Sequence, residues 1–403
     1  MSGAEEHVSR NRDPGAHLDR PLTERLRRAP VSAALLALFI LLFAATLAAT
    51  LAGAPDPAAS ALRSLWTLDL TESKEVLLSL GALELSQIWV DGEWWRVLTT
   101  SLLHGSLLHL VLNAVAFWSI SEWIELECGR LHTWTVFILA SIGGGLASLA
   151  WCEAPIVLGA SAGILGQAGA LLLARLFGPE PLRERLTPIS PANLTSIIAL
   201  CLVLGVLVPG IAQAGHLGGL LTGLLVGAAW LARTTVIRLS WLLALALLLG
   251  DLAWVGTTPT GRVNYYGVLG TRVRDDALKL EREGVPSAEQ KSRARELFQQ
   301  GLLLAPNNAN FRNEIAYQYA LDGEELELAE RLALEALALE PMNPSYLDTL
   351  AWIWCRQGSS APALRVLQMV LSLDEDPSEE VRSHIRDCED VSRGTPTSAK
   401  TAN

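Results

Sequence analysis

Seven long apolar segments lie between residues 31 and 256, separated by short polar stretches. They cover about 31–52, 98–120, 132–151, 157–177, 193–209, 215–232 and 236–256. A helix of about 20 apolar residues crosses the hydrocarbon core of a bilayer. Because lipid offers the backbone no hydrogen-bond partners, a membrane-spanning segment favours the helix. The pattern therefore predicts an all-α, polytopic membrane bundle with seven spans.

The first apolar segment follows a polar stretch that ends in a cluster of arginines. Residues 1–30 are polar and are predicted to be disordered. The segment 31–52 is long and lies far from the N-terminus, so we interpret it as an anchored span and not as a cleaved signal peptide. Arg25, Arg27 and Arg28 directly precede it. Since basic residues flank spans on the cytoplasmic side, we expect a cytoplasmic N-terminus.

The charges of the later loops agree with spans of alternating orientation. Arginines occur in the loops predicted to be cytoplasmic, namely Arg130, then Arg175, Arg183 and Arg185, then Arg233 and Arg238. The opposite loops, 53–97 and 152–156, have no such basic excess. Positively charged loops remain in the cytoplasm. The chain is therefore predicted to be a multi-pass plasma (inner) membrane protein, and the region after the seventh span is expected to be extracytoplasmic.

Residues 257–403 differ in composition from the membrane region and contain a repeat. They carry 16 Lys and Arg against 23 Asp and Glu, as a soluble domain does. Four positions recur at an offset of 35 residues: Pro306, Phe311, Ala316 and Gly323 correspond to Pro341, Tyr346, Ala351 and Gly358. A period near 34, with small residues where paired helices pack, resembles the tetratricopeptide repeat. We expect helical repeats over 257–390 and a disordered tail over 391–403.

Composition narrows the range of partners. Repeats of this kind usually bind a protein or peptide partner, and simple steric bulk is the alternative. The formal net charge of −11, with no basic region, argues against nucleic acid as a partner. The five cysteines show no zinc-like spacing. Cys355 and Cys388 are candidates for oxidation if their region is exported, and the sequence leaves that open.

The second apolar segment contains polar residues, which need partners inside a membrane. These are His104, His109 and Asn113, and the last two lie four residues apart, on one helix face. Three interpretations stay open. The histidines and a third group bind zinc, the residues form a structural polar seam, or His109 and Asn113 donate to a developing negative charge. No HExxH motif or neighbouring carboxylate supports the metal site, so no metal or cofactor is expected.

Two further segments contribute a serine and a histidine. Ser161 lies in LGASAGILG, residues 158–166, at the start of an apolar segment. His216 stands beside a face on which glycine recurs every fourth residue, at 215, 219, 223 and 227. Either motif alone is typical of helix packing. With alternating spans, however, both residues and the His109–Asn113 pair fall near the extracytoplasmic ends of their helices. A serine and a histidine facing two donors point to acyl transfer.

Four motifs together resemble the rhomboid family of intramembrane serine proteases. They are GEWWR at 92–96, HxxxxHxxxN at 104–113, GxS at 159–161 and HxxGxxxG at 216–223, in the family's order and spacing within residues 31–256. The resemblance implies a six-helix core with one further C-terminal span. It implies Ser161 as nucleophile and His216 as general base and later acid. His109, Asn113 and the backbone N–H of Ser161 would form the oxyanion hole.

The same resemblance implies supporting residues and a substrate class. The supporting residues are His104, Gly159, Gly219, Gly223, Trp95 and Arg96. The histidine supports the architecture of the site, the glycines permit close backbone approach, and the Trp–Arg pair matches the family's membrane-interface loop. Substrates are expected to be transmembrane proteins of the lipid bilayer, cleaved near its extracytoplasmic face. A flexible element around residues 209–215 is expected to gate their entry.

Two positions depart from the family's pattern. Ala162 stands where many members have glycine, and Leu165 stands where many have an aromatic residue packed on the histidine. They motivate an alternative function, an inactive rhomboid-like protein that binds membrane clients. A small-solute transporter ranks last, because the polar residues cluster towards one side of the membrane. Asp251, an acid within the seventh span, is expected to serve packing or topology and not catalysis.

Overall fold

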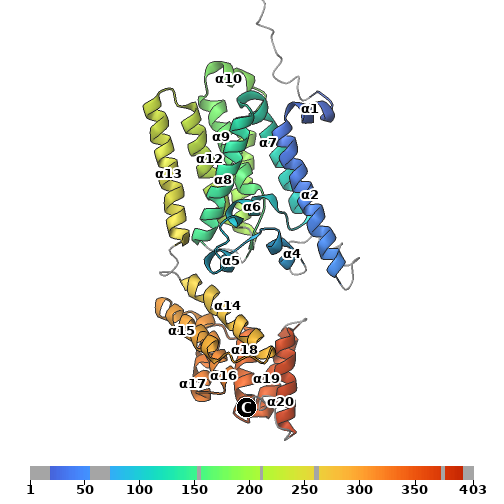
Figure 1. Ribbon diagram of the computed structural model, residues 1–403, viewed down its shortest axis with the longest axis vertical. Coiled ribbons are helices and arrows are strands. Elements are labelled where there is room, and N and C mark those ends of the chain that lie inside the picture. Colours follow the sequence, from blue (N-terminus) through green and yellow to red (C-terminus); the bar gives the residue numbers. More distant parts are fainter. Residues whose placement is uncertain are drawn as a thin grey trace, which may run out of the picture. The chain divides into compact units, whose positions relative to one another are not determined.

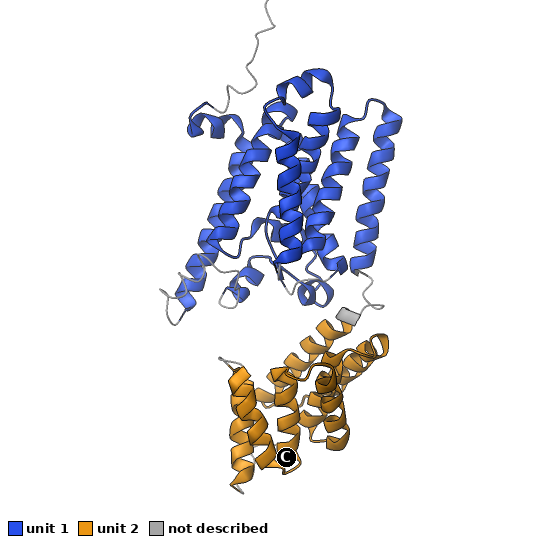
Figure 2. Cartoon of the chain, turned by 180° about the vertical axis from the view of Figure 1, so that it is seen from behind, with its two compact units in different colours: residues 1–258 blue, residues 259–403 orange. Residues whose placement is uncertain are grey.

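The computed structural model describes residues 19–54, 73–151, 156–208, 212–257, 263–373 and 377–393. The predicted disorder of residues 1–18 and 394–403 lies outside these ranges, as does the part of the predicted gate at 209–211. The chain divides into two compact units, residues 1–258 and 259–403 (Figure 2). Both units are built from helices.

The first unit is a bundle of long helices with short elements at both ends (Figure 1). The long helices are α2 (Pro30–Gly53), α7 (Leu107–Cys128), α8 (Arg130–Trp151), α9 (Ser161–Phe177), α11 (Pro191–Leu207), α12 (Gln213–Leu231) and α13 (Thr235–Thr257). The short elements are α1 (Leu22–Arg28), α4 (Lys74–Ser79), β1 (Leu83–Glu84), α5 (Leu85–Trp89), α6 (Arg96–Thr99), the 3-10 helix η1 (Thr100–Leu102), β2 (Ile156–Val157) and α10 (Glu180–Arg185). The predicted helical fold class is confirmed.

Each predicted span corresponds to one long helix. Five of these, α2, α7, α8, α12 and α13, are long and apolar enough to cross a membrane by length and composition. The other two, α9 and α11, are apolar helices of 17 residues each. In the most apolar part of α8, 67% of the residues are buried inside the protein, against 11% in α13. Thus α8 is an inner helix, whereas α13 lies at the edge and turns apolar side chains outward.

The second span begins later than the sequence predicts. The predicted segment starts at residue 98, whereas α7 starts at Leu107, because the chain first forms α6 and η1. Ser106 caps α7, and its hydroxyl accepts a hydrogen bond from the backbone N–H of His109 at 3.2 Å. Apolar composition alone does not reveal this cap. As a result, His104 precedes the helix and His109 lies in its first turn.

The N-terminal stretch also differs from the prediction, since residues 22–28 form α1 where disorder is expected. Arg25 of α1 pairs with the buried carboxylate of Glu122 near the C-terminal end of α7. Glu125, one turn further along α7, accepts from the backbone N–H of Ser32 at 2.7 Å, at the start of α2. A carboxylate at a helix N-terminus is favourable. These partners lie some 90 residues along the chain, so local composition does not reveal them.

Basic residues gather at this end of the bundle. Arg185 of α10 donates to Glu127 of α7 at 2.7 Å, and Arg130 lies 3.8 Å from Glu125. Together with Arg25, they surround the C-terminal end of α7. Figure 1 shows α1 and α10 at the same end of the unit. Arginines from loops that the sequence predicts to be cytoplasmic therefore lie on one side.

The second unit is a series of helices. In the described residues these are α14 (Val263–Arg282), α15 (Ala288–Leu304), α16 (Ala309–Asp322), α17 (Leu326–Leu339), α18 (Pro344–Arg356), α19 (Ser360–Leu373) and α20 (Glu379–Ser392). Consecutive helices pack in pairs, α14 on α15, α16 on α17 and α18 on α19. The helices α16 and α18 also contact each other. Stacked helix pairs are the arrangement that the 35-residue repeat predicts.

The repeated residues occupy equivalent places in α16 and α18. Asn308 and Asn343 each cap their helix through the side-chain oxygen. Gly323 and Gly358 follow the helices with positive φ angles of 68° and 85°. The remaining repeated core positions are all buried: Phe311, Ala316, Tyr346 and Ala351. The repeat therefore encodes helix starts, helix ends and the helix-packing core.

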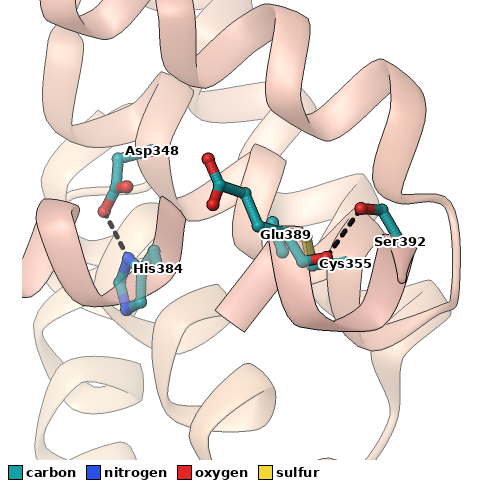
Figure 3. Close-up of a disulfide and its surroundings, with 6 residues drawn as sticks. Asp348, Cys355, His384, Glu389 and Ser392 are labelled. Atoms are coloured by element: carbon teal, nitrogen blue, oxygen red, sulfur yellow. Dashed lines mark hydrogen bonds and ion pairs between the residues drawn. A yellow bond between two sulfur atoms is a disulfide. The ribbon is translucent and has the colours of Figure 1, made fainter. Parts of the chain in front are cut away.

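A disulfide and a polar pair fasten α20 to α18. Cys355 and Cys388 are joined, with their Cα atoms 5.4 Å apart (Figure 3). Nearby, Nδ1 of His384 lies 2.9 Å from a carboxylate oxygen of Asp348. The His384 ring also stacks on Trp352, with ring centroids 4.4 Å apart. The last helix is thus attached both covalently and by buried polar contacts.

Candidate active site

Ser161 is the first residue of α9, and the strand before it is tied to the short elements. β2 pairs antiparallel with β1. Thr100 fastens the segment further, because its hydroxyl donates to the carbonyl of Val157 and its own carbonyl accepts from the N–H of Gly159 at 3.0 Å. The first N–H groups of a helix have no intrahelical partners. Those of Ser161 and Ala162 therefore stand free of the α9 ladder beside the serine hydroxyl.

Gly159 holds an unusual backbone conformation directly before Ser161. Its φ is +119°, a region that residues with a side chain rarely adopt. A Cβ at this position would lie 2.8 Å from both Cε1 and Nε2 of His109. Glycine is thus required twice, by the backbone angle and by the close approach of the imidazole. The edge of the His109 ring lies against the backbone that leads into Ser161.

The helices α9 and α12 cross in close contact, which brings serine and histidine together. A Cβ on Gly219 would lie 2.3 Å from the carbonyl oxygen of Ala162, and one on Gly223 would lie 2.2 Å from Gly166. Small residues let two helix backbones touch in this way. One turn before Gly219, the Nε2 atom of His216 lies 2.8 Å from Oγ of Ser161. The side chains are 55 positions apart in sequence.

Ala162 fits a notch in the neighbouring helix α8. A Cβ on Gly144 would lie 2.4 Å from the Ala162 methyl carbon and 2.8 Å from the carbonyl oxygen of Gly215. The methyl group therefore occupies space that glycine at 144 leaves open. Leu165, the other departure from the rhomboid pattern, is 1% exposed. The packing accommodates both departures while Ser161 and His216 stay within hydrogen-bond distance.

The polar residues of α7 lie beside this pair. His109 reaches the backbone at Gly159, two residues before Ser161. Asn113 is buried, and its amide donates one hydrogen bond to the carbonyl of His109 at 3.0 Å. His104 is buried behind them, with its ring 5.2 Å from that of His109 and 5.4 Å from that of Phe39. It packs against the site from outside the helix.

Trp95 and Arg96 organise the short elements. Arg96 is 5% exposed and donates to the carbonyl of Ala82 and to the side chain of Gln87, both at 2.9 Å. Its guanidinium lies 4.6 Å from the ring centroid of Trp95, which is half-exposed. Arg96 also donates to the carbonyl of Leu78 in α4, so its contacts join α4, α5 and α6. Among the described residues, no hydrogen bond or ring contact joins either of them to Ser161 or His216, so their placement fits a structural role.

The described residues offer no cluster suited to a metal ion, since no group of three or more His, Cys, Asp or Glu side chains converges among them. His104 and His109 meet ring edge to ring face and do not converge on a point. Asp251 is exposed on α13. The zinc interpretation of the histidines therefore has no third ligand in the described part of the chain.

The arrangement suits acyl transfer. A serine hydroxyl within hydrogen-bond distance of an imidazole can lose its proton as it attacks. Free N–H groups at the start of α9, with His109 opposite, can stabilise negative charge on a substrate oxygen. The pair lies near the first turn of α7, and the arginine cluster surrounds the last turn of that 22-residue helix, about 30 Å away along its axis.

Sequence reasoning missed three residues that shape the site. Thr100 ties the strand before Ser161 to the short elements, Gly144 makes room for Ala162, and Gln213 lies one turn before His216 on α12. Threonine, glycine and glutamine are common in membrane helices and loops, so residue type alone does not single out these three positions. The partners of Thr100 and Gly144 lie on other elements. The signal for Gln213 was its i, i+3 spacing from a catalytic candidate.

Comparison with known proteins gives the same family as the motifs. Residues 91–233 match the Rhomboid domain. The chain is 36% identical over 155 residues to "Rhomboid protease GluP" of Bacillus subtilis (strain 168), covering 38% of this chain and 29% of that protein. It is 28% identical over 181 residues to "Rhomboid protease AarA" of Providencia stuartii, covering 40% and 64%. It is 30% identical over 164 residues to "RHOMBOID-like protein 4" of Arabidopsis thaliana, covering 41% of each.

The family match is confined to residues 91–233, within the first unit. The chain spans between 29% and 64% of the length of these relatives. Among solved structures, "TPR2AB-domain:pHSP90-complex of yeast Sti1" aligns with 69% of this chain and 96% of that chain. Its identity of 12% and TM-score of 0.23 are too low to support an argument about the fold.

Proposed function

We propose that this chain, whose residues 91–233 are a rhomboid domain, is an intramembrane serine endopeptidase that cleaves transmembrane proteins. The observation that carries the proposal is the 2.8 Å distance between Oγ of Ser161 and Nε2 of His216. The serine stands at the N-terminus of α9, where the helix dipole and free N–H groups favour negative charge. Membership in a family that includes named rhomboid proteases supports the same reaction.

In the first step, Oγ of Ser161 attacks the carbonyl carbon of the scissile peptide bond. As the new C–O bond forms, Nε2 of His216 takes the hydroxyl proton, and the carbonyl electron pair moves to the substrate oxygen. A neutral serine is a weak nucleophile without such a base. His216 must therefore be neutral, with its Nε2 lone pair directed at the hydroxyl.

The negative oxygen formed in this step is held by donors on two helices. The backbone N–H of Ser161 is one donor, and the side chains of His109 and Asn113 are the others. Asn113 has a second amide hydrogen besides the one that it gives to the carbonyl of His109. Removing one donor of an oxyanion hole commonly lowers kcat by about 10²–10³.

Collapse of the tetrahedral intermediate completes acylation. The protonated His216 gives its proton to the leaving nitrogen as the C–N bond breaks, which leaves an acyl ester on Ser161. Water then attacks that ester while His216 accepts a proton from it, and the same proton returns to Oγ of Ser161 as the acid product leaves. The cycle needs one serine and one imidazole, with no carboxylate.

We further propose that the site opens on the extracytoplasmic side of the plasma membrane. The arginine cluster at the opposite end of the bundle supports a cytoplasmic location for that end. Trp89 of α5 donates to the carbonyl of Gly256 at 2.8 Å, so the chain leaves the membrane unit at the end that carries Ser161. The Cys355–Cys388 disulfide supports an oxidising compartment for the second unit.

The second unit is proposed to be a tetratricopeptide-like domain that binds a protein or peptide partner. Its paired helices and the equivalent caps of α16 and α18 support this assignment. Stacked repeats form extended binding surfaces. Such a domain would recruit substrates or regulators on the extracytoplasmic side of the membrane.

The test is cleavage of a reconstituted transmembrane substrate by the full chain and by two serine variants. Ser161→Ala is expected to abolish cleavage. Ser119→Ala is the matched control, because that hydroxyl only donates to the carbonyl of Ala116 within α7, and it should cleave like the unchanged protein. Equal cleavage by the Ser161→Ala variant would refute the protease assignment.

A fluorophosphonate probe separates the protease from the client-binding alternative. The probe reacts with an activated serine, so it should label Ser161, and His216→Ala should prevent labelling. A chain that binds membrane proteins but shows no labelling and no cleavage would instead be the inactive rhomboid-like protein.

A further inference from the structure

Among the described residues, the second ring nitrogen of His216 has no hydrogen-bond partner. Nε2 faces Ser161, whereas Nδ1 is buried and makes no hydrogen bond with any of them. For Nε2 to accept the serine proton, the neutral ring must carry its own proton on Nδ1. A buried N–H without an acceptor costs free energy and leaves the ring free to turn. The dyad therefore requires an acceptor at Nδ1.

A buried acceptor without a partner lies close by. Gln213 is the first residue of α12, three positions before His216 and on the same face of the helix. Its Oε1 atom is buried and makes no hydrogen bond within the described ranges. The two unpaired atoms have complementary roles, since an amide oxygen accepts and Nδ1–H donates.

Gly205 of the neighbouring helix α11 lies close to both atoms. A Cβ on Gly205 would lie 1.9 Å from Oε1 of Gln213 and 3.4 Å from Nδ1 of His216. Both atoms thus approach the same point on α11, which stays open because residue 205 has no side chain.

Three other groups lie near His216, one on each of three neighbouring helices. They are the Ser161 hydroxyl on α9, the His109 ring on α7 and the backbone carbonyl of Cys201 on α11. The hydroxyl is on the Nε2 side, and His109 lies against Gly159. The Cys201 carbonyl is the competing acceptor for Nδ1. It makes no hydrogen bond of normal geometry with that atom.

We propose that Gln213 is a positioning residue that accepts the Nδ1 proton of His216 and so fixes the ring's tautomer and orientation. The proposal rests on the proposed function, in which His216 is the base. When His216 takes the proton of Ser161, the imidazolium keeps Nδ1–H bound to the amide oxygen. The amide itself gains no proton. It holds the ring so that Nε2 faces first the serine and then the leaving nitrogen.

Four variants test this role. Gln213→Leu removes the acceptor, and Gln213→Asn and Gln213→Glu are the conservative variants that keep one. Gly205→Ala displaces the amide from the other side, because its methyl group would meet Oε1 while its 3.4 Å approach to Nδ1 is an ordinary contact. Leu217→Ala is the control on α12, since Leu217 follows His216 but is 43% exposed.

The first measurement is the rate of cleavage of a transmembrane substrate as a function of pH. Gln213→Leu and Gly205→Ala are expected to lower kcat about tenfold, the effect of losing one hydrogen bond of about 1.4 kcal/mol in the transition state, with KM unchanged. Gln213→Glu should retain activity and move the acidic limb of the pH profile to higher pH, because a carboxylate stabilises the imidazolium. Leu217→Ala should leave both unchanged.

The second measurement does not depend on proteolysis. In protein with ¹⁵N-labelled histidine, NMR reports whether His216 carries its proton on Nδ1, and fluorophosphonate labelling reports how reactive Ser161 is. Loss of the Nδ1-protonated form and slower labelling in Gln213→Leu would support the proposal even if no substrate were cleaved. An unchanged tautomer and labelling rate in that variant would overturn it and assign Nδ1 to the Cys201 carbonyl.

Discussion

At the scale of single residues, the site depends on glycines that leave space for neighbouring side chains. Glycine at 159 lets the His109 ring approach, glycine at 205 leaves room for Gln213, and glycine at 144 receives the Ala162 methyl group. Interiors are packed tightly enough that one methyl group matters. Ala162 and Gly144 of α8 therefore form a complementary pair, in which the methyl group of one fills the space left by the other.

That pairing predicts a rescue. Gly144→Ala should destabilise the protein by about 1–3 kcal/mol, because the new methyl group overlaps that of Ala162, and it should slow labelling of Ser161. Adding Ala162→Gly should restore part of the loss, since the carbonyl of Gly215 still lies near the new methyl. A double-mutant cycle of thermal unfolding in detergent measures the coupling. Strictly additive effects would show that the two residues do not share this space.

At the scale of elements, the two ends of α7 have different structural roles. Its first turn carries His109 at the candidate site, and its last turns carry acids that hold α1 and the start of α2. Glu125 is 1% exposed and binds the N-terminus of α2, whereas Glu127 is 21% exposed and pairs with Arg185. The attachment of α2 at this end therefore rests on the buried carboxylate of Glu125.

A matched pair of variants follows. Glu125→Ala should lower the free energy of unfolding by about 1–3 kcal/mol, because it leaves the backbone N–H groups of α2 unpaired. Glu127→Ala should cost at most about 1 kcal/mol, as expected for an exposed ion pair. Thermal unfolding in detergent compares the two. An equal or larger loss from Glu127→Ala would contradict the assigned role of Glu125.

At the scale of the whole molecule, the two units have different sources of stability. The membrane unit relies on close helix packing through glycines, and the second unit adds a covalent link between α18 and α20. Disulfides of secreted domains persist because their compartment is oxidising. The redox state of two cysteines is therefore a measure of the chain's topology.

We expect Cys355 and Cys388 in the native membrane to react with maleimide only after reduction. Peptide mapping after denaturation measures this, with Cys128, a free cysteine, as the control that labels with or without reductant. Replacing both half-cystines by serine should lower the stability of the second unit by about 2–4 kcal/mol. Labelling of Cys355 without a reductant would contradict an extracytoplasmic location.

The sequence by itself determined the helical class, the order of the spans and the repeat period. It did so because apolar length and a 35-residue offset are local or periodic signals, and they need no knowledge of packing. Motif spacing also identified Ser161 and His216 as candidates, since their type and predicted depth agreed. It placed the start of the second span nine residues too early, because the cap at Ser106 is a hydrogen bond and not a change in hydropathy.

Only the tertiary structure decided which atoms meet. The 2.8 Å contact of Ser161 with His216 depends on the crossing of α9 and α12. The partners of Arg25 and Glu125 lie on other helices, and so does the Gly205 opening beside Gln213. Apart from the approach of Gln213 to Gly205, these contacts join positions tens of residues apart, and no local pattern encodes them. The physical reason is that side-chain distances follow from helix packing, which is a property of the whole bundle.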